Sequence, residues 1–222
     1  MTRERQVAQV SVHAIVSVMP RKLLVATHNR GKLREYADLL SGLPFTLVSP
    51  DELGLDLQVA ESGATYVDNA RLKALAYAQA SGLLTLADDS GLEVDALDGA
   101  PGVRSARYAL GDDADRVKAL LRALAEAGIA EDNRSARFRC VIVAAAPDGR
   151  SWCTEGECAG QLIDTPRGSG GFGYDPVFFI PSHGCTMAEL PPEEKNRISH
   201  RARAAQAMRP ILEKLSGESD VR

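Results

Sequence analysis

The chain has 222 residues, of which 45% are hydrophobic and 25% charged, and its formal net charge is −4. Such values are typical of one globular domain with a sizeable core, and no apolar run reaches the roughly 18 residues of a membrane span. The acidic balance argues against broad nucleic-acid binding, although a small anionic ligand remains compatible with it. The four cysteines lack a zinc or redox spacing, so we expect free thiols in a cytoplasmic protein.

Residues 1–20 are expected to be an extension without chemistry. Their charged start and following valines faintly resemble a signal peptide, but Gln9 and His13 interrupt the apolar part and no cleavage site follows. Met19 is a plausible alternative first residue. We expect one domain over residues 21–216 and a C-terminal tail over residues 217–222.

The first half of the domain alternates strands and helices. Apolar runs and helical periodicity predict, in chain order, strand 22–26, helix 33–40, strand 43–48, helix 65–80 and strand 83–87. Thr65 and Asp68 form a capping-box pattern before the second helix, and Gly82 follows its end. The sequence Asp-Asp-Ser-Gly at 88–91 then stands at the C-terminal end of the last strand.

The second half begins with a helix and ends with one. The same patterns predict helix 114–127, a hairpin of strands 138–146 and 151–157, strand 177–180 and a helix from about residue 199. Pro210 should kink or interrupt this last helix. The mixture of elements predicts an α/β fold with a mixed sheet.

Four polar clusters interrupt these elements, and the first two suit phosphate and metal. The loop Thr27-His28-Asn29-Arg30-Gly31-Lys32 joins a strand to a helix, where backbone N–H groups and a lysine favour a phosphate group. It is not a Walker A loop, because Leu33 stands where Ser or Thr would bind magnesium. The second cluster is acidic and consists of Glu61, Asp88 and Asp89. Such carboxylates suit Mg²⁺ and can deprotonate an attacking water.

The other two clusters suit a nucleotide base. Glycines precede Phe172-Gly173-Tyr174-Asp175, so the backbone can approach a ligand closely while an aromatic ring stacks on a base. Lys195, His200 and Arg201 can donate hydrogen bonds to carbonyl or phosphate oxygens.

Each cluster alone also has an ordinary structural explanation. The lysine in the first loop can be a solvated surface residue, and the Asp-Asp-Ser-Gly stretch can be a capped turn. The aromatic segment can be a hairpin turn with Phe172 and Tyr174 in the core, and the basic segment an exposed helix face.

In their order and in their residues, these clusters together resemble the inosine-triphosphatase-type purine nucleoside triphosphate pyrophosphatases, also called dITP/XTP pyrophosphatases. The resemblance covers about residues 22–215. It is carried by the segments VATHNRGKLRE, ESGATYVDNARLKA, LADDSGLEVDALDGAPGVRSARYA, GSGGFGYDPVFFIP and AELPPEEKNRISHRARA.

The resemblance implies a fold and an activity. Members of that family have a long mixed sheet with flanking helices and two lobes around a central nucleotide-binding cleft, and they are usually homodimers. They hydrolyse ITP, dITP and XTP to the monophosphate and pyrophosphate with Mg²⁺, cutting between the α- and β-phosphates. The resemblance therefore implies a small nucleotide as the binding partner, and it implies binding neither to nucleic acid nor to a membrane.

Roles for individual residues follow from the same resemblance. Glu61 and Asp89 would bind magnesium, and Asp89 would accept a proton from the attacking water. The phosphates would be held by the loop from Thr27 to Lys32, and Ser90 would touch the substrate. Base and sugar would be held by Phe172, Gly173, Tyr174 and Asp175, and the purine enclosed by Lys195, His200 and Arg201.

Local chemistry adds two expectations. His200 and Arg201 would donate hydrogen bonds to the C6 oxygen of hypoxanthine and xanthine. The amino group of adenine would instead present a donor to these donors. Lys73, one helical turn after Asn69, is a candidate for a second phosphate contact. Asp88 and Asp95 are spare carboxylates near the expected site, so the number of metal ions stays open.

Three other functions fit parts of the sequence. A pyrophosphatase for modified pyrimidine nucleotides, as in the Maf-type family, is disfavoured by the FGYD and SHR segments. A binding module without catalysis is disfavoured by the combination of Lys32, Glu61 and Asp89. A phosphatase that releases single phosphates differs in product and not in its need for a metal.

Overall fold

The structure, a computed structural model, describes residues 20–217. The predicted extension up to residue 19 and the tail from residue 218 lie outside the described residues. The strands are β1 (Arg21–Val25), β2 (Phe45–Val48), β3 (Leu84–Val94), β4 (Ser135–Ala145), β5 (Ser151–Leu162), β6 (Phe178–Ile180) and β7 (Cys185–Thr186). The helices are α1 (Arg30–Leu39), α2 (Tyr66–Ser81), α3 (Asp113–Glu126), α4 (Pro192–Ile198) and α5 (His200–Gly217).

The strands form one sheet in the order β2-β1-β3-β4-β5-β6-β7. The pairs β1–β2 and β1–β3 are parallel, and every pair from β3 to β7 is antiparallel. This arrangement confirms the predicted α/β fold with a mixed sheet and flanking helices.

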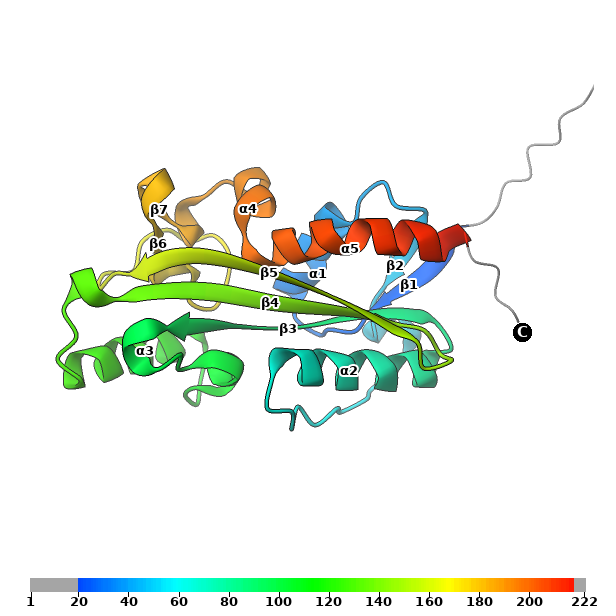
Figure 1. The fold of residues 1–222 in the computed structure, drawn as a ribbon, viewed down its shortest axis with the longest axis horizontal. Coiled ribbons are helices and arrows are strands. Elements are labelled where there is room, and N and C mark those ends of the chain that lie inside the picture. Colours follow the sequence, from blue (N-terminus) through cyan, green and yellow to red (C-terminus); the bar gives the residue numbers. More distant parts are fainter. Residues whose placement is uncertain (1–19, 218–222) are drawn as a thin grey trace, which may run out of the picture.

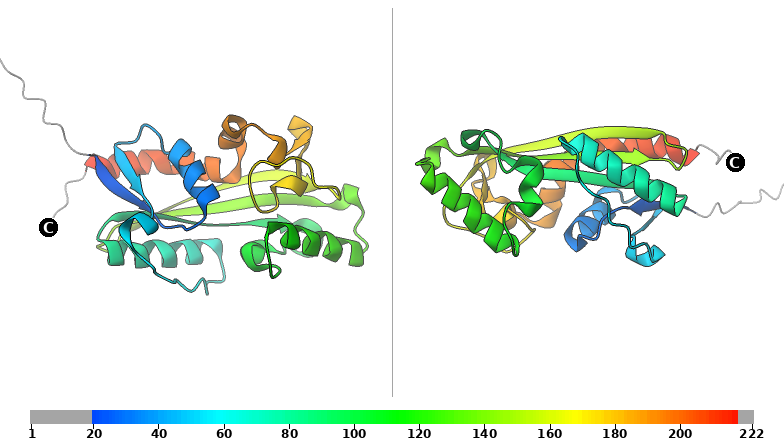
Figure 2. Two further views of the ribbon diagram at one scale, coloured as in Figure 1. Left: turned by 180° about the vertical axis from the view of Figure 1, so that it is seen from behind. Right: turned by 90° about the horizontal axis from the view of Figure 1, so that it is seen from below.

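Helices cover both faces of the sheet (Figure 1). The long strands β3, β4 and β5 run the length of the molecule, with α5 along one face and α2 and α3 along the other. Figure 2 shows α1, β1 and β2 toward one end and α3, β6 and β7 toward the other. We call these ends the first lobe and the second lobe.

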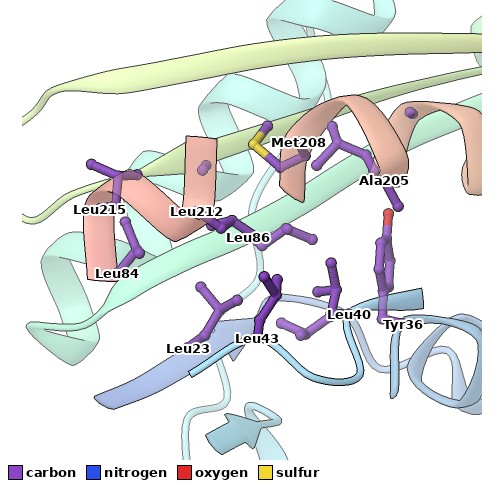
Figure 3. Close-up of a cluster of buried hydrophobic side chains, with 14 of the residues drawn as sticks. Leu23, Tyr36, Leu40, Leu43, Leu84, Leu86, Ala205, Met208, Leu212 and Leu215 are labelled. Carbon is purple, nitrogen blue, oxygen red and sulfur yellow. The ribbon is translucent and has the colours of Figure 1, made fainter. Parts of the chain in front are cut away.

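The core between α5 and the first lobe is built from aliphatic side chains (Figure 3). Leu23 of β1 and Leu86 of β3 face Met208 and Leu212 of α5, and all four are fully buried. Tyr36 of α1 closes the same cluster. Burial on this scale stabilises the fold by about 25 cal/mol per Å² of apolar surface.

Local sequence signals set the ends of α2 as expected. Thr65 caps the helix, because its hydroxyl oxygen accepts a hydrogen bond of 3.2 Å from the backbone N–H of Asp68. Gly82 follows with φ of 68°, a left-handed conformation that glycine adopts without strain.

The predicted end of the third strand is wrong. The sequence placed Asp88 to Gly91 after the strand, but β3 continues through them to Val94. Their backbone pairs with β4, where Asp88 lies opposite Ile142 and Gly91 opposite Arg139. Long-range pairing with β4 thus overrides the low strand propensity of Asp and Gly, and the two aspartates alternate across the sheet.

The predicted interruption of the last helix is also wrong. α5 runs from His200 through Pro210 to Gly217, which the sequence had assigned to the tail. Proline removes one backbone hydrogen bond, but Met208, Leu212 and Leu215 on either side are buried against the sheet. This packing holds the helix together across the proline.

Candidate active site

A cavity opens between the two lobes beside β3. β1 pairs with β3 only from Leu84 to Leu86, and the chain then leaves the sheet into the loop before α1. The edge of β3 from Asp89 to Leu92 therefore has β4 on one side and the cavity on the other. Residues from both lobes line this cavity, among them Lys32 and Asp113.

The acidic end of the cavity contains Asp89 and Glu61. Burial raises the pKa of Asp89 above its ordinary value, the negative charge of Glu61 raises it further, and a hydrogen bond from Asn69 opposes the increase. Asn69 is fully buried and donates from Nδ2 to Asp89 Oδ2 over 3.0 Å. Its Oδ1 accepts from the N–H of Gly63 over 2.8 Å. One amide thus connects Asp89 to the loop that carries Glu61.

Glu61 is surrounded by cations. Its carboxylate forms ion pairs with Lys73 and with Arg107, the latter at 3.3 Å. Burial opposes ionisation, but these cations hold the pKa of Glu61 below its usual range. Lys73 also donates to the backbone oxygen of Asp88 over 3.2 Å. Of the predicted acidic residues, Glu61 and Asp89 therefore line the cavity together with Lys73, whereas Asp88 does not line it.

The predicted phosphate loop divides into residues that face the cavity and residues that do not. Asn29 and Lys32 line the cavity, and Lys32 Nζ lies 2.9 Å from Asp88 Oδ2. Asn29 Oδ1 accepts from the N–H groups of Gly31 and Lys32 and so caps α1. The other members, Thr27, His28, Arg30 and Gly31, do not line it.

Two of those members have partners elsewhere. His28 lies between Asp51 and the hydroxyl group of Tyr77, at 2.9 and 3.2 Å. Thr27 accepts a hydrogen bond from the N–H of Asn29.

A chain of buried ion pairs connects the phosphate loop to the glycine-rich segment. Asp88 contacts both Lys32 and Arg201, and these cations hold its pKa well below the usual range although burial opposes them. Glu35 of α1 contacts Arg201 at 2.6 Å and Lys195 at 2.8 Å. Lys195 then contacts Asp175 at 2.7 Å. The chain crosses from the first lobe to the second.

Arg201 has a largely structural role in this series of ion pairs. Its side chain is 1% exposed and donates to Glu35, Asp88 and Ser90. Such a guanidinium has little donor capacity left for a base. Of the two residues predicted to recognise the C6 oxygen of the base, His200 has more free hydrogen-bonding atoms than Arg201.

His200 also lines the cavity. Its ring stacks on Phe138 with centroids 4.7 Å apart, and its buried Nδ1 has no hydrogen-bond partner among residues 20–217. Burial, together with the charges of Arg201 and Lys195, places the pKa of His200 well below its ordinary value. The imidazole is therefore neutral at pH 7 and can donate or accept according to its tautomer.

The glycine-rich segment splits between cavity and core. The ring of Phe172 lies over Lys195 and Arg201, at 5.0 and 5.4 Å from its centroid. Tyr174 is buried in the core and its hydroxyl group donates to the backbone oxygen of Ser105 over 3.0 Å. The alternative of two core rings thus holds for Tyr174 only. Asp175 accepts from the N–H of Phe172 over 2.9 Å.

Most predicted site residues are brought together, and several lining residues were not predicted. Those predicted and found in the lining are Asn29, Lys32, Glu61, Lys73, Asp89, Ser90, Phe172, Gly173, Tyr174, Asp175, Lys195, His200 and Arg201. The sequence analysis missed the roles of Asn69, Asp113, Arg116 and Phe138. Asn69 had one signal, its position one turn before Lys73 on the same helix face. Asp95 does not line the cavity and pairs with Arg137.

The donor atoms at the acidic end suit a hard divalent cation. Residues 20–217 contain no group of three or more His, Cys, Asp or Glu side chains arranged as a metal site. Mg²⁺, however, usually takes only one or two protein carboxylates and completes its shell with phosphate oxygens and water. Glu61 and Asp89 line the same cavity, and they are close enough for the charge of Glu61 to raise the pKa of Asp89. This pair of carboxylates fits that requirement.

Known proteins share this sequence and fold. A model of the Ham1 family matches residues 23–211. A dITP/XTP pyrophosphatase of Geobacter sulfurreducens is 50% identical over 194 residues, which cover 86% of this chain and 96% of that protein. The solved structure of a HAM1 protein from Coxiella burnetii has a TM-score of 0.79 and 40% identity, covering 87% of this chain and 99% of its own.

A second solved structure agrees with these matches. A nucleoside-triphosphatase, or dITP/XTP pyrophosphatase, from Mycobacterium abscessus has a TM-score of 0.67 and 42% identity, covering 85% of this chain and 99% of its own. The relatives therefore match this chain over nearly their whole length, and they confirm the resemblance seen in the sequence. The chain belongs to the Ham1 family.

Proposed function

We propose that this protein hydrolyses the deaminated purine nucleoside triphosphates ITP, dITP and XTP to the monophosphate and pyrophosphate. The observation that carries the proposal is the polarity of one cavity. Glu61, Asp89 and Lys73 lie together in one part of it. Phe172 and the neutral His200 line another part, beside Lys195. A triphosphate and a purine base have matching requirements. Curated relatives named dITP/XTP pyrophosphatases support the same substrates.

The acidic end supplies the groups for water attack at the α-phosphorus. Asp89 is the proposed proton acceptor, because its raised pKa makes it a better base than an exposed aspartate. Asn69 directs one carboxylate oxygen and leaves the other facing the backbone of Ser90. The ammonium groups of Lys32 and Lys73 neutralise charge on the phosphates as the bond to pyrophosphate breaks.

Magnesium belongs to the proposal as a bound cofactor. Glu61 and Asp89 would hold it together with the phosphate oxygens. When bound, such an ion neutralises phosphate charge and lowers the pKa of a coordinated water. Lys73 and Arg107 contact Glu61 in the structure, so they are placed to turn toward the triphosphate once Glu61 has another partner.

The other end of the cavity selects the base. A neutral His200 offers one N–H donor beside the purine, which matches the C6 oxygen of hypoxanthine and xanthine. The same donor would face the amino group of adenine. Lys195 lies in the same lining and is a second donor. Base selection in this proposal depends most on His200, because Lys195 and Arg201 are both engaged by ion pairs.

Three related expectations remain predictions. The homodimer implied by the family resemblance can be tested by light scattering. A cytoplasmic location and the lack of nucleic-acid binding likewise follow from sequence alone. Among residues 20–217, no helix is long and apolar enough to span a membrane.

The test measures pyrophosphate and single phosphate released from ITP, XTP, ATP, GTP and dTTP, with magnesium or with chelator. We expect fast pyrophosphate release from ITP and XTP with magnesium only. Asp89→Asn should lower the rate by about 10² to 10⁴, the usual worth of a general base. Asp95→Asn is the matched control, because its carboxylate lies outside the cavity and should leave the rate unchanged.

Other outcomes identify other functions. Release of single phosphates would indicate a general phosphatase. A preference for dTTP would indicate a pyrimidine nucleotide enzyme, and binding without turnover would indicate a binding module.

A further inference from the structure

The turn that carries Phe172 has cavities on both sides. Phe172 and Gly173 line the cavity that contains Asp89. They also line a second, mostly apolar cavity of about 570 Å³ between the glycine-rich segment and α3. At Gly173 nothing in the described part of the chain lies within 4 Å of the place of a Cβ atom, so few dispersion contacts hold this point of the turn. The position of Gly173 therefore depends on the polar contacts of its backbone.

The beginning and the end of the segment are fixed by neighbouring backbone and by Lys195. The N–H of Gly170 donates to the backbone oxygen of Ala188 over 3.0 Å. The N–H of Phe172 donates to Asp175, whose carboxylate also contacts Lys195. These contacts come from the loop around Ala188, from the segment itself and from α4.

One further contact crosses from α3. The N–H of Gly173 donates to Oδ2 of Asp113 over 2.7 Å, although the two residues are 60 positions apart in the chain. Gly173 has φ of 64°, a left-handed conformation that favours glycine. Hydrogen bonds to a carboxylate are about twice as strong as those between neutral groups.

Asp113 is itself well positioned. Its Oδ1 pairs with Arg116, which donates to the backbone oxygen of Gly111 over 3.0 Å. The preceding residue, Asp112, forms a capping box with Asp115 at the start of α3. The contact with Arg116 thus orients the carboxylate, leaving Oδ2 for Gly173.

The turn determines where the Phe172 ring lies. That ring covers Lys195 and Arg201, and it packs so closely on Gly31 of α1 that a Cβ there would lie 2.7 Å from its Cδ1. A small displacement of Gly173 would move the ring relative to the first lobe. Because the proposed base site lies beside this ring, the position of the turn affects substrate binding.

We propose that Asp113 is a positioning residue that holds the Gly173 turn, and with it the Phe172 ring, in the place that binds the purine base. This inference rests on the proposed function. It assigns to α3, which touches no reacting group, a part in substrate affinity. Among residues 20–217, the turn forms no hydrogen bond or ion pair with Glu61, Lys73 or Asp89, so the contribution should appear in KM rather than in kcat.

The experiment compares Asp113→Ala, Asp113→Asn and Asp112→Ala with the unaltered protein. Two quantities are measured: KM and kcat for ITP with magnesium, and amide hydrogen exchange of the peptide 168–176 without nucleotide. For Asp113→Ala we expect a KM about fivefold higher, kcat within about twofold, and faster exchange in that peptide. The side chain of Asp113 is 46% exposed, which limits the effect.

The two other variants separate positioning from helix stability. Asp113→Asn keeps an acceptor oxygen and should restore both KM and protection. Asp112→Ala removes the helix cap without touching Gly173 and should leave KM unchanged.

The inference is overturned if KM or the exchange rate is unchanged in Asp113→Ala, if Asn fails to rescue, or if Asp112→Ala raises KM equally. Failure of the proposed function would give a different result, since the unaltered protein would then release no pyrophosphate. The exchange of peptide 168–176, measured with and without ITP, still decides the role of Asp113 in that case.

Discussion

The amide of Asn69 donates a hydrogen bond of 3.0 Å to the carboxylate of Asp89, and both side chains are buried. The N–H of Gly63 holds the other end of the amide, so its orientation is set. The proposed catalytic carboxylate is therefore directed by a residue from α2, on a different element from its own.

Asn69→Ala is expected to slow turnover and to move its acid limit. The hydrogen bond lowers the pKa of Asp89 against burial and the charge of Glu61. Its loss raises that pKa, and since a base acts when ionised, the acid limb of kcat/KM should move to higher pH. The measurement is the pH dependence of pyrophosphate release from ITP. Gln79→Ala, exposed on the same helix, should leave the limb in place; an unmoved limb in Asn69→Ala would refute the assignment.

Lys73→Ala should lower kcat/KM for ITP by about tenfold. The variant loses a cation that contacts Glu61 and Asp88 and that faces the proposed phosphate site. Steady-state kinetics of pyrophosphate release give the number. Arg71→Ala removes an exposed cation from the same helix and serves as the matched control. Unchanged turnover in Lys73→Ala would remove Lys73 from the phosphate site.

Gly31→Ala should weaken substrate binding without a change of charge. The new Cβ would lie 2.7 Å from Cδ1 of Phe172, too close for a carbon–carbon contact, so the ring must move. We expect a severalfold higher KM for ITP. Gly217→Ala adds a methyl group where nothing lies within 4 Å and should leave KM unaltered. Equal KM values in the two variants would show that the Phe172 ring can move aside without affecting substrate binding.

His200 should make the protein less stable as the pH falls. Its pKa is well below 6.5 in the folded protein, so below 6.5 the unfolded chain binds a proton that the folded protein does not. The unfolding free energy should therefore decrease between pH 7.5 and pH 5.5. Urea unfolding of the unaltered protein and of His200→Gln at both pH values gives the difference. A decrease of the same size in both proteins would contradict the prediction.

Arg201→Met should destabilise the fold by about 3 kcal/mol. The substitution leaves Asp88 and Glu35 each without one of their buried cations. Thermal or urea unfolding tests it, with Arg203→Ala as control because Arg203 is exposed and bonds only to the backbone of Glu157 among the described residues. A stable Arg201→Met variant that loses base selectivity would return Arg201 to the base site.

Much of the fold could be predicted from the sequence, because its signals are local. The Thr65 cap and Gly82 delimit α2, and the helix predicted over residues 114–127 is found as α3, which buries Val117, Leu120 and Leu124. These features depend on residues within one or two turns of each other. The family resemblance added the identity of the main site residues, and the cavity brings most of them together.

Tertiary structure decided the rest. Asp88 and Asp89 are neighbours in the chain, but the alternation of β3 sends Asp88 into the ion pairs with Lys32 and Arg201 and Asp89 to Asn69. Which of two adjacent carboxylates has a raised pKa is thus set by partners that are distant in sequence.

The sequence by itself determined most of the elements, the family and the kinds of side chain at the site, since these follow from local periodicity and from motifs. Only the tertiary structure decided that β3 continues through Asp88 and Asp89, that Arg201 is a buried cross-link, and that Asp113 reaches Gly173. The physical reason is that burial and long-range pairing fix a side chain's charge, partners and direction, and neither can be read from its neighbours in the chain.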